Sequence, residues 1–393
     1  MKILHIICSV NPVGGGPIEG VKQLAAVNRI SGHQIEVASL DAPDSPHIQA
    51  FFVPVHALGP GLLKYHYSSR LVPWLRENAG NYDVVVVNGI WQYHSFGAWR
   101  ALRNCNTPYV VFTHGMLGPW FKTTYPLKHF KKWLYWPWGD YRVLRDAHAV
   151  LFTCEEERVL ARQSFPHLYR CNEVVVGYGT ADPKGDPQAE LETFFGRYPQ
   201  LRGKRLALFL GRIHPIKGCD LLIQAFAKVL AADSNWHHVM CGADQVGLQR
   251  KLSAMAEQLN LSDRITWAGV VGGDLKWGAL RASEVFVLPS HHENFGIVVA
   301  EALACGVPVL ISNKVNIWRE VQDAGAGVVA EDDLEGTCSL LKAWLALPSE
   351  QRSEMRKRAV ACFQTRFEIH QAADTLLRVL TSVAKERSSD ANA

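Results

Sequence analysis

The sequence predicts an α/β protein made of two doubly wound parallel-sheet domains. Its 393 residues are more than one compact core usually contains. Short apolar runs alternate with segments of helical composition, which is typical of parallel sheets covered by helices. A stretch rich in Gly, Pro and charge interrupts this alternation mid-chain. We therefore expect an N-terminal domain over 1–178, a linker over 179–203, a second domain over 204–366 and a terminal helix over 367–385.

The first half alternates as a doubly wound sheet requires. Its apolar runs include DVVVVN and YVVFT, which are the length of strands buried on both faces. Expected strands are 3–8, 35–40, 51–57, 83–88, 109–113, 148–153 and 173–176, and expected helices are 18–29, 93–103, 126–145 and 155–164.

The second half repeats the pattern. Expected strands are 206–210, 237–241, 264–268, 285–288, 309–311 and 326–330, and expected helices are 219–232, 245–259, 273–282, 297–304, 316–323, 333–346, 350–363 and 367–384. The polar residues from Lys385 to the end are expected to be disordered.

Composition indicates an ordinary soluble globular protein of a reducing cytoplasm. Charged residues make up 20% and apolar residues 48% of the chain. The nine cysteines are scattered without a C-x-x-C pair, which argues against disulfides and structural zinc. A formal net charge of +4 is too weak to indicate a nucleic-acid partner, and no apolar run reaches the roughly 18 residues that span a bilayer.

Residues 285–311 carry the strongest functional pattern. An apolar strand is followed by a polar loop that contains Glu293 and Asn294, and then by a helix that carries Glu301. The amides of Phe295, Gly296 and Ile297 would lie at the positive end of that helix, which suits a phosphate. A carboxylate on either side suits paired hydroxyls, so the pattern indicates a sugar nucleotide. The alternative is that Glu293 complements the helix dipole and Glu301 is an exposed helix residue.

Two cations follow the first strand of the second half, within LFLGRIHPIKG. Arg212 and Lys217 lie in a loop at the carboxyl end of a parallel strand, where ligands of such sheets bind. Arginine and lysine both suit phosphate oxygens, although a pair of solvated surface cations would look the same. Gly242 in CGAD and Val270 in WAGVV mark two further turns at strand ends.

The first half contains candidate site residues in less specific motifs. Gly15 and Gly16, in GGGP, precede a helix and could bring backbone amides to a phosphate, but a tight turn needs such glycines too. The spacing is not that of a dinucleotide fingerprint, which disfavours a dehydrogenase. His114, in THG, ends a buried strand, where a histidine is either a polar cap or part of a site.

These motifs resemble those of glycosyltransferase family 4. The run ENFGIVVAEALACGVPV resembles the E-x7-E signature of these retaining, sugar-nucleotide-dependent enzymes, and GRIHPIKG resembles their diphosphate-binding element. The resemblance implies the GT-B fold, in which two Rossmann-like domains face each other across a cleft and a C-terminal helix returns to the first domain.

The resemblance also implies a role for each site residue. His114 would contact the donor sugar, Glu293 the hydroxyls of that sugar, and Glu301 the ribose. Arg212 and Lys217 would hold the diphosphate. The remaining donor-binding positions would act largely through backbone groups: Gly15, Gly16, Gly242, Val270, Asn294, Phe295, Gly296 and Ile297.

The implied reaction is retaining transfer of a hexose to a hydroxyl of a polysaccharide or lipid-linked oligosaccharide, in exopolysaccharide or envelope biosynthesis. UDP-glucose is the favoured donor, and GDP-hexose is the alternative. The diphosphate oxygen would take the acceptor's proton, so no general base is assigned. The alternatives are a nucleotide-sugar epimerase of the same fold and a sugar-nucleotide-binding protein without catalysis.

No cofactor or metal is expected. The sequence contains no D-x-D, so the positive charge on the leaving diphosphate would come from Arg212, Lys217 and the helix N-terminus.

Residues 116–145 are rich in both aromatic and basic side chains. Belts of this kind suit the headgroup layer of an anionic membrane, so we expect peripheral attachment to its inner face. Stacking platforms for single-stranded nucleic acid need similar chemistry, and a helix with aromatics in the core is the simplest alternative.

Overall fold

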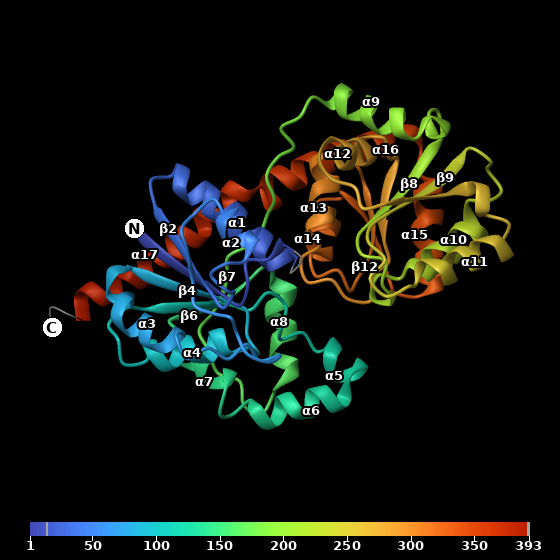
Figure 1. The fold of residues 1–393 in the computed structure, drawn as a ribbon. Coiled ribbons are helices and arrows are strands. Elements are labelled where there is room, and N and C mark those ends of the chain that lie inside the picture. The colour runs from blue at the N-terminus through green and yellow to red at the C-terminus, as the bar shows by residue number, and fades with distance from the viewer. Residues whose placement is uncertain (13–14, 391–393) are drawn as a thin grey trace. The chain divides into compact units, whose positions relative to one another are not determined.

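A computed structural model describes residues 1–12 and 15–390 (Figure 1). The chain divides into two compact units. The first contains Met1–Gly179 together with the chain from Ile369 onward, and the second contains Thr180–Glu368. Each unit holds one parallel sheet covered by helices, which confirms the predicted α/β class.

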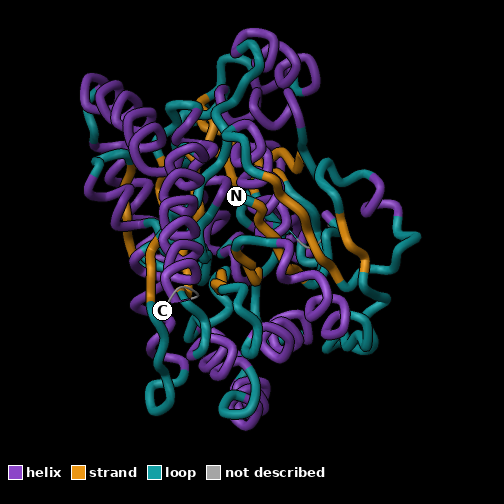
Figure 2. The backbone as a smooth tube through the Cα atoms, turned by 90° about the vertical axis from the view of Figure 1, so that its left-hand side faces the viewer, coloured by secondary structure: helices purple, strands orange, loops and turns teal. Residues whose placement is uncertain are grey.

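The first unit contains a seven-stranded parallel sheet in the order β3-β2-β1-β4-β5-β6-β7. The strands, drawn in orange in Figure 2, are short and contain no internal Gly or Pro, and the central ones are almost entirely apolar. They are β1 Lys2–Ile7, β2 Gln34–Ser39, β3 Val55–Ala57, β4 Val84–Asn88, β5 Tyr109–Phe112, β6 Ala149–Phe152 and β7 Glu173–Val175.

Helices of the first unit pack around this sheet. They are α1 Gly16–Ile30, α2 Pro46–Gln49, α3 Leu71–Asn78, α4 Tyr93–Leu102, α5 Trp120–Thr124, α6 Pro126–Tyr135, α7 Asp140–Arg145, α8 Glu155–Ser164 and the terminal helix α17 Ile369–Asp390. Helix α17 packs on α1 and β4, so the end of the chain joins the first unit (Figure 1).

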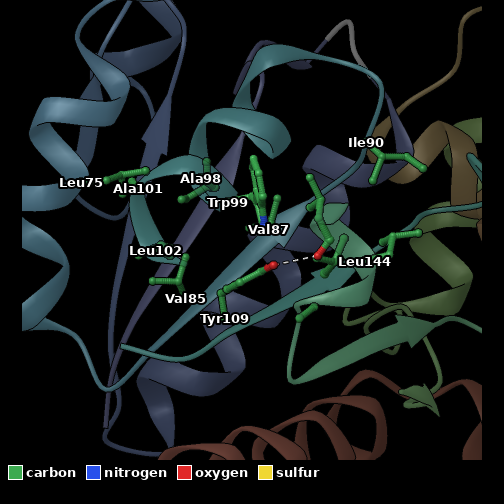
Figure 3. Packing of buried hydrophobic residues seen from close by; sticks show 14 of the residues in the cluster. Leu75, Val85, Val87, Ile90, Ala98, Trp99, Ala101, Leu102, Tyr109 and Leu144 are labelled. Atoms are coloured by element: carbon green, nitrogen blue, oxygen red, sulfur yellow. Dashed lines mark hydrogen bonds between the residues drawn. The ribbon is translucent and has the colours of Figure 1, made fainter. Parts of the chain in front are cut away.

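Its core lies between the sheet and α3, α4 and α7. Val85 and Val87 of β4 are fully buried and meet Trp99 and Leu102 of α4 (Figure 3). The buried hydroxyl of Tyr109 donates a hydrogen bond of 2.8 Å to the carbonyl of Val143, so this polar group is satisfied inside the core.

The second unit contains a six-stranded parallel sheet in the order β10-β9-β8-β11-β12-β13. The strands are β8 Arg205–Leu210, β9 Trp236–Cys241, β10 Ile265–Gly269, β11 Val285–Leu288, β12 Val309–Ser312 and β13 Gly327–Ala330. The helices are α9 Pro187–Arg197, α10 Cys219–Val229, α11 Gln249–Gln258, α12 Gly273–Arg281, α13 Ile297–Ala304, α14 Trp318–Asp323, α15 Leu334–Ala346 and α16 Ser349–Cys362.

Each sheet has one point where its strand order reverses. It lies between β1 and β4 in the first unit, and between β8 and β11 in the second. Loops that leave the carboxyl ends of two such strands diverge to opposite faces of the sheet, which opens a crevice for ligands. Candidate site residues are therefore expected near these two points.

The segment 179–203 differs from the linker expected there. It contains α9, which packs on α12. Asp186 is the N-cap of this helix, and its carboxylate accepts a hydrogen bond from the Ala189 amide. Phe194 is fully buried, and the buried carboxylate of Glu190 pairs with Arg281 at 2.5 Å. This segment has few apolar positions, so its sequence shows no clear helical period and the helix was not predicted.

Other elements also differ from the expectation. The single helix expected over 126–145 is interrupted between α6 and α7, since Pro137 can neither donate to a helical carbonyl nor follow a helical residue easily. Helices α2, α3 and α5 were not predicted, and the strand expected over 51–57 is limited to Val55–Ala57. The terminal helix extends to Asp390, so the predicted disorder from Lys385 is wrong up to that residue, and 391–393 lie outside the described residues.

Candidate functional site

In the second unit, the loop after β8 packs against the loop after β11. The amide of His291 donates to the carbonyl of Ile216 at 2.8 Å, and the Ser290 hydroxyl donates to the same carbonyl at 2.9 Å. Gly218 has φ of +65°, and a Cβ there would lie 2.2 Å from the Pro289 carbonyl oxygen. Only glycine permits this approach, so the two loops are held against each other at the reversal point.

Lys217 and Glu293 meet at this junction. Their Nζ and Oε2 atoms form an ion pair, and Lys217 is only 8% exposed. Glu293 is also fixed through its backbone, because its amide donates to the Lys314 carbonyl at 2.9 Å. The structure thus brings together the cation expected to hold a diphosphate and the carboxylate expected to bind sugar hydroxyls.

Arg212 lies on the same loop but is exposed. Its guanidinium is 3.5 Å from the side-chain oxygen of Gln245 and not in the pair with Glu293. His214, between the two cations in sequence, has its pKa lowered by burial and by the positive charges of Arg212 and Lys217. An anion at this loop would therefore meet positive charge from both side chains.

Glu301 lies in α13 and is almost buried, so the alternative of an exposed helix residue is wrong. Its Oε1 is 2.8 Å from Nζ of Lys276 in α12, and the residue is 7% exposed. Lys276 also lies 4.1 Å above the Trp277 ring. The contact with Lys276 fixes the orientation of this carboxylate, which suits it to accept hydrogen bonds from a ribose diol.

The start of α13 is shaped by Gly296. This residue is the N-cap, with φ of +75°, so the chain turns through the left-handed region just before Ile297 begins the helix. Phe295 is 5% exposed and its ring packs on Phe367, so its side chain belongs to the core and only its backbone can serve a ligand. Asn294 accepts a hydrogen bond of 3.4 Å from Asn316.

Gly242 and Val270 follow the neighbouring strands β9 and β10. Gly242 has φ of +149°, and a Cβ there would lie 1.7 Å from the Gly211 carbonyl oxygen, so glycine is required. Its amide donates to the Gly269 carbonyl at 2.7 Å. Val270 is 75% exposed, which leaves its backbone and side chain accessible at the same edge of the sheet.

In the first unit, His114 follows β5 beside the reversal point. Its φ of +48° lies in the left-handed region, which is unfavourable for a histidine. The ring stacks on Phe112 with centroids 4.5 Å apart and meets the edge of Tyr178. Burial lowers the pKa of His114 to about 3, so the ring is neutral at pH 7.

Glu157 of α8 holds this turn in place. Its Oε1 accepts from the Thr113 hydroxyl at 2.7 Å and from the Gly115 amide at 2.5 Å, on either side of His114. Its Oε2 accepts from the amide and hydroxyl of Thr153 at 2.7 and 2.6 Å. These four bonds compensate for burying the carboxylate and for the backbone strain at His114.

Asn88, the last residue of β4, determines which ring nitrogen of His114 carries a hydrogen. Its Nδ2 lies 3.1 Å from the Val86 carbonyl oxygen and 3.4 Å from that of Ile6. A carbonyl oxygen only accepts, so this side of the amide is the NH2 group and Oδ1 faces His114 at 3.2 Å from Nε2. Nε2 therefore carries the hydrogen, and Nδ1 is left as an acceptor for a hydroxyl group.

Gly15 and Gly16 lie at the start of α1. Gly15 is the N-cap with φ of +81°, and a Cβ on either glycine would meet no atom within 4 Å. The Tyr178 hydroxyl donates to the Gly16 carbonyl at 3.0 Å, which anchors the turn. The first residue of GGGP, Gly14, lies outside the described residues.

Sequence reasoning missed three residues of these sites: Asn88, Glu157 and Lys276. Asn88 had a recognisable signal, since it is the polar end of an apolar strand beside the reversal point. Glu157 and Lys276 had none, because each acts on a partner far away in the sequence.

Comparisons with known proteins match both units. The family described as Glycosyl transferases group 1 matches residues 192–361, and the one described as Glycosyl transferase 4-like domain matches residues 15–179. D-inositol 3-phosphate glycosyltransferase of Geodermatophilus obscurus is 33% identical over 271 residues, which cover 64% of this chain and 56% of that protein. The protein of the same name from Segniliparus rotundus is 33% identical over 178 residues, 44% of this chain and 39% of its own. The chain thus spans about half or less of the length of these curated relatives.

Solved structures share the fold over nearly the whole chain. Sucrose-phosphate synthase from Thermosynechococcus elongatus has a TM-score of 0.77 at 20% identity, covering 97% of this chain and 98% of its own. Anabaena HepE in complex with UDP has a TM-score of 0.77 at 17% identity, covering 97% and 100%. Because the two family matches together cover most of both units, the chain belongs to the GT-B glycosyltransferases of the family 4 type.

Proposed function

We propose that this protein is a retaining glycosyltransferase that moves a hexose from UDP-hexose to a hydroxyl of a polysaccharide or lipid-linked oligosaccharide. UDP-glucose is the favoured donor, and exopolysaccharide or envelope biosynthesis is the proposed setting. The observation that carries the proposal is the pair of carboxylate–lysine contacts in the second unit, Glu293 with Lys217 and Glu301 with Lys276.

These contacts suit the parts of a sugar nucleotide. Lys217, with Arg212 on the same loop and the N-terminus of α13, offers positive charge to a diphosphate. Glu301 offers acceptor oxygens to a ribose diol, and Glu293 offers them to hydroxyls of the donor sugar. Anabaena HepE was solved with UDP and with UDP-glucose, which supports a UDP donor. GDP-hexose is the alternative donor.

The proposed chemistry needs little from the protein beyond placement and charge. Positive charge at the leaving diphosphate lowers the barrier to breaking the glycosidic bond. The acceptor hydroxyl then attacks from the face that the diphosphate leaves, and a diphosphate oxygen takes its proton, so configuration is retained. His114 contributes a neutral ring with Nδ1 as acceptor for a donor-sugar hydroxyl.

The curated relatives suggest a second acceptor. Several are D-inositol 3-phosphate glycosyltransferases, so a phosphorylated cyclic polyol is a candidate acceptor as well. A nucleotide-sugar epimerase of the same fold and a sugar-nucleotide-binding protein without catalysis remain the alternatives from other classes. We further propose a cytoplasmic protein that attaches peripherally to the inner face of the membrane.

The test is to incubate the protein with UDP-glucose, UDP-galactose or GDP-mannose, with and without acceptor. The acceptors are inositol 3-phosphate and a lipid-linked glycan fraction, and the readouts are released diphosphate and the anomeric configuration of the product by NMR. Diphosphate released only with acceptor, and a retained anomer, are expected. Release or epimerisation without acceptor would favour the epimerase, whereas donor binding without product would favour a binding protein.

The same assay is run with EDTA. Turnover is expected to persist, because the proposed charge on the leaving group comes from side chains and a helix N-terminus. Loss of turnover in EDTA that magnesium restores would show that the reaction needs a metal.

A further inference from the structure

Helix α6 presents its apolar side to solvent. Leu127 is 80% exposed, Phe130 57%, Trp133 54% and Leu134 53%. Their spacing at three and four residues places these side chains on one face of the helix. A surface helix normally packs this face on the protein, so α6 has the reverse orientation.

The opposite face of α6, which does contact the protein, is polar. Lys132 lies 4.3 Å above the Trp91 ring, and its burial lowers its pKa to about 8. The Tyr135 hydroxyl lies 2.7 Å from that of Tyr65, and the ring of His129 stacks on Phe165 at 5.2 Å. These contacts fix the orientation of the helix, because rotating it to bury the apolar face would break all of them.

The helix is anchored at its end by Trp136. This side chain is 2% exposed, stacks on Phe165 at 4.1 Å and donates to the Leu168 carbonyl at 2.6 Å. Just beyond it, Trp138 is 69% exposed and extends the apolar surface. The exposed face is thus held on a rigid base.

Two exposed lysines, Lys128 and Lys131, lie on the same helix as this apolar face. Residues 116–145 contain six basic side chains and one carboxylate. The carboxylate belongs to Asp140, which is fully buried and accepts hydrogen bonds from Ser95 and the Trp91 amide. The basic residues are Lys122, Lys128, Lys131, Lys132, Arg142 and Arg145. Lys132 contacts Trp91 on the side that faces the protein, and Arg145 pairs with Asp146, so the exposed lysines of α6 itself are Lys128 and Lys131. An apolar face with exposed tryptophans and flanking lysines complements an anionic lipid surface.

We propose that α6, through Leu127, Phe130, Trp133 and Leu134, docks this protein on an anionic lipid bilayer. The apolar side chains enter the headgroup boundary, and Lys128 and Lys131 contact anionic headgroups. Within the described residues, no helix is long and apolar enough to cross a bilayer, so the attachment is at the surface. A second copy of the chain would instead bring the flanking lysines of both copies together, which like-charge repulsion opposes.

The test is sedimentation of the full chain with vesicles of phosphatidylcholine alone or with phosphatidylglycerol. One variant combines Phe130→Ser with Leu134→Ser, and another combines Lys128→Ser with Lys131→Ser. Lys132 is left intact, because it packs between Trp91 and Phe121. The control is Leu63→Ser, which removes another apolar side chain that is 90% exposed.

Binding to anionic vesicles at low salt and weaker binding at high salt are expected. The lysine variant should bind about 30-fold more weakly, since each cation near such a surface accounts for about fivefold. The apolar variant should lose about tenfold or more, and the control should match the wild type. UDP titration of every variant should be unchanged, which separates this proposal from that of glycosyl transfer.

Several results would overturn the proposal. They are no binding at low salt, equal binding to neutral and anionic vesicles, and lipid binding that neither variant weakens. Self-association abolished by the apolar variant without vesicles would assign the face to a second copy. Binding of a single-stranded oligonucleotide, lost in the lysine variant while vesicles are not bound, would assign it to nucleic acid.

Discussion

Lys217 and Glu293 form an ion pair where the loops after β8 and β11 meet, and the lysine of this pair is nearly buried. A lysine has three N–H donors, so it can keep this carboxylate and still donate to a phosphate oxygen. The pair therefore links the proposed diphosphate site to the proposed sugar site. Glu293 also offsets the cost of burying the cation before a donor arrives.

We expect Lys217→Ala to weaken UDP binding by about tenfold to a hundredfold, since a charge-assisted hydrogen bond contributes roughly 1.5–3 kcal/mol. Uridine, which has no phosphate, should bind the variant and wild type alike. Calorimetry of both ligands measures this. Lys314→Ala is the matched control, because Lys314 lies on the next strand-end loop and pairs with Glu331 instead. Equal UDP affinity of the Lys217 variant and wild type would contradict the assignment.

Glu293→Gln should separate binding from turnover. Removing the negative charge leaves Lys217 without its counter-ion. Free UDP should therefore bind this variant at least as tightly as it binds the wild type. Transfer should nevertheless fall, because an amide accepts sugar hydroxyls less well than a carboxylate does. The measurement is UDP affinity by calorimetry beside steady-state kcat. A variant that bound UDP poorly and transferred normally would reverse the proposed roles.

Glu301 and Lys276 should act on the ribose as one unit. Glu301→Ala is expected to weaken UDP binding by about tenfold or more, and Lys276→Met to weaken it less, because the carboxylate loses only its orientation. Both losses of affinity should be smaller for 2′-deoxy-UDP, which lacks one of the hydroxyls that would donate a hydrogen bond to Glu301. Calorimetry of the two nucleotides with each variant tests this. Equal losses for UDP and 2′-deoxy-UDP would mean that the pair only stabilises α12 against α13.

The sequence was sufficient for the fold because most elements are defined locally. Apolar runs such as 84–88 have one stable environment, a sheet buried on both faces, and the observed strand agrees with the expectation to within a residue. The prediction was wrong for the segment 187–197 because this segment is not defined locally. Its helix is stabilised by contacts with α12, far along the chain, and not by a strong apolar period of its own.

Some residues of the candidate site could also be predicted from the sequence and others could not. Glu293 and Glu301 are recognisable because they lie in one continuous motif around a helix start. Lys276 is separated from Glu301 by 25 residues and meets it only when α12 packs beside α13. The reversed face of α6 was also beyond the sequence, since a pattern gives the spacing of apolar residues but not the side they face.

Asn88 should control the tautomer of His114. In the wild type, 15N NMR of the histidine rings is expected to show Nε2 protonated and Nδ1 unprotonated. Asn88→Leu removes the acceptor, so the fixed tautomer should be lost and kcat for transfer should fall about tenfold or more. Asn88→Gln could restore an acceptor and serves as the conservative comparison. A His114 ring with Nδ1 protonated in the wild type would contradict the hydrogen-bond assignment.

Acid should weaken the first unit through its buried histidines. Burial lowers the pKa of His5 to about 4, that of His94 to about 4 and that of His114 to about 3. The unfolded chain, with histidine pKa near 6.5, binds more protons below that pH. The stabilisation is therefore complete above about pH 6.5 and is lost as pH falls towards 4.

Each of these histidines should lower the free energy of unfolding by about 2 kcal/mol between pH 7 and pH 5. Hydrogen exchange of β1 and β4, corrected for the intrinsic rate at each pH, measures this within the first unit. His94→Gln should reduce the dependence on pH, because glutamine can donate to the Asn88 carbonyl without titrating. His148→Gln, at an exposed position, is the control and should leave it unchanged. Protection that is the same at both pH values would show that these rings are not held neutral by burial.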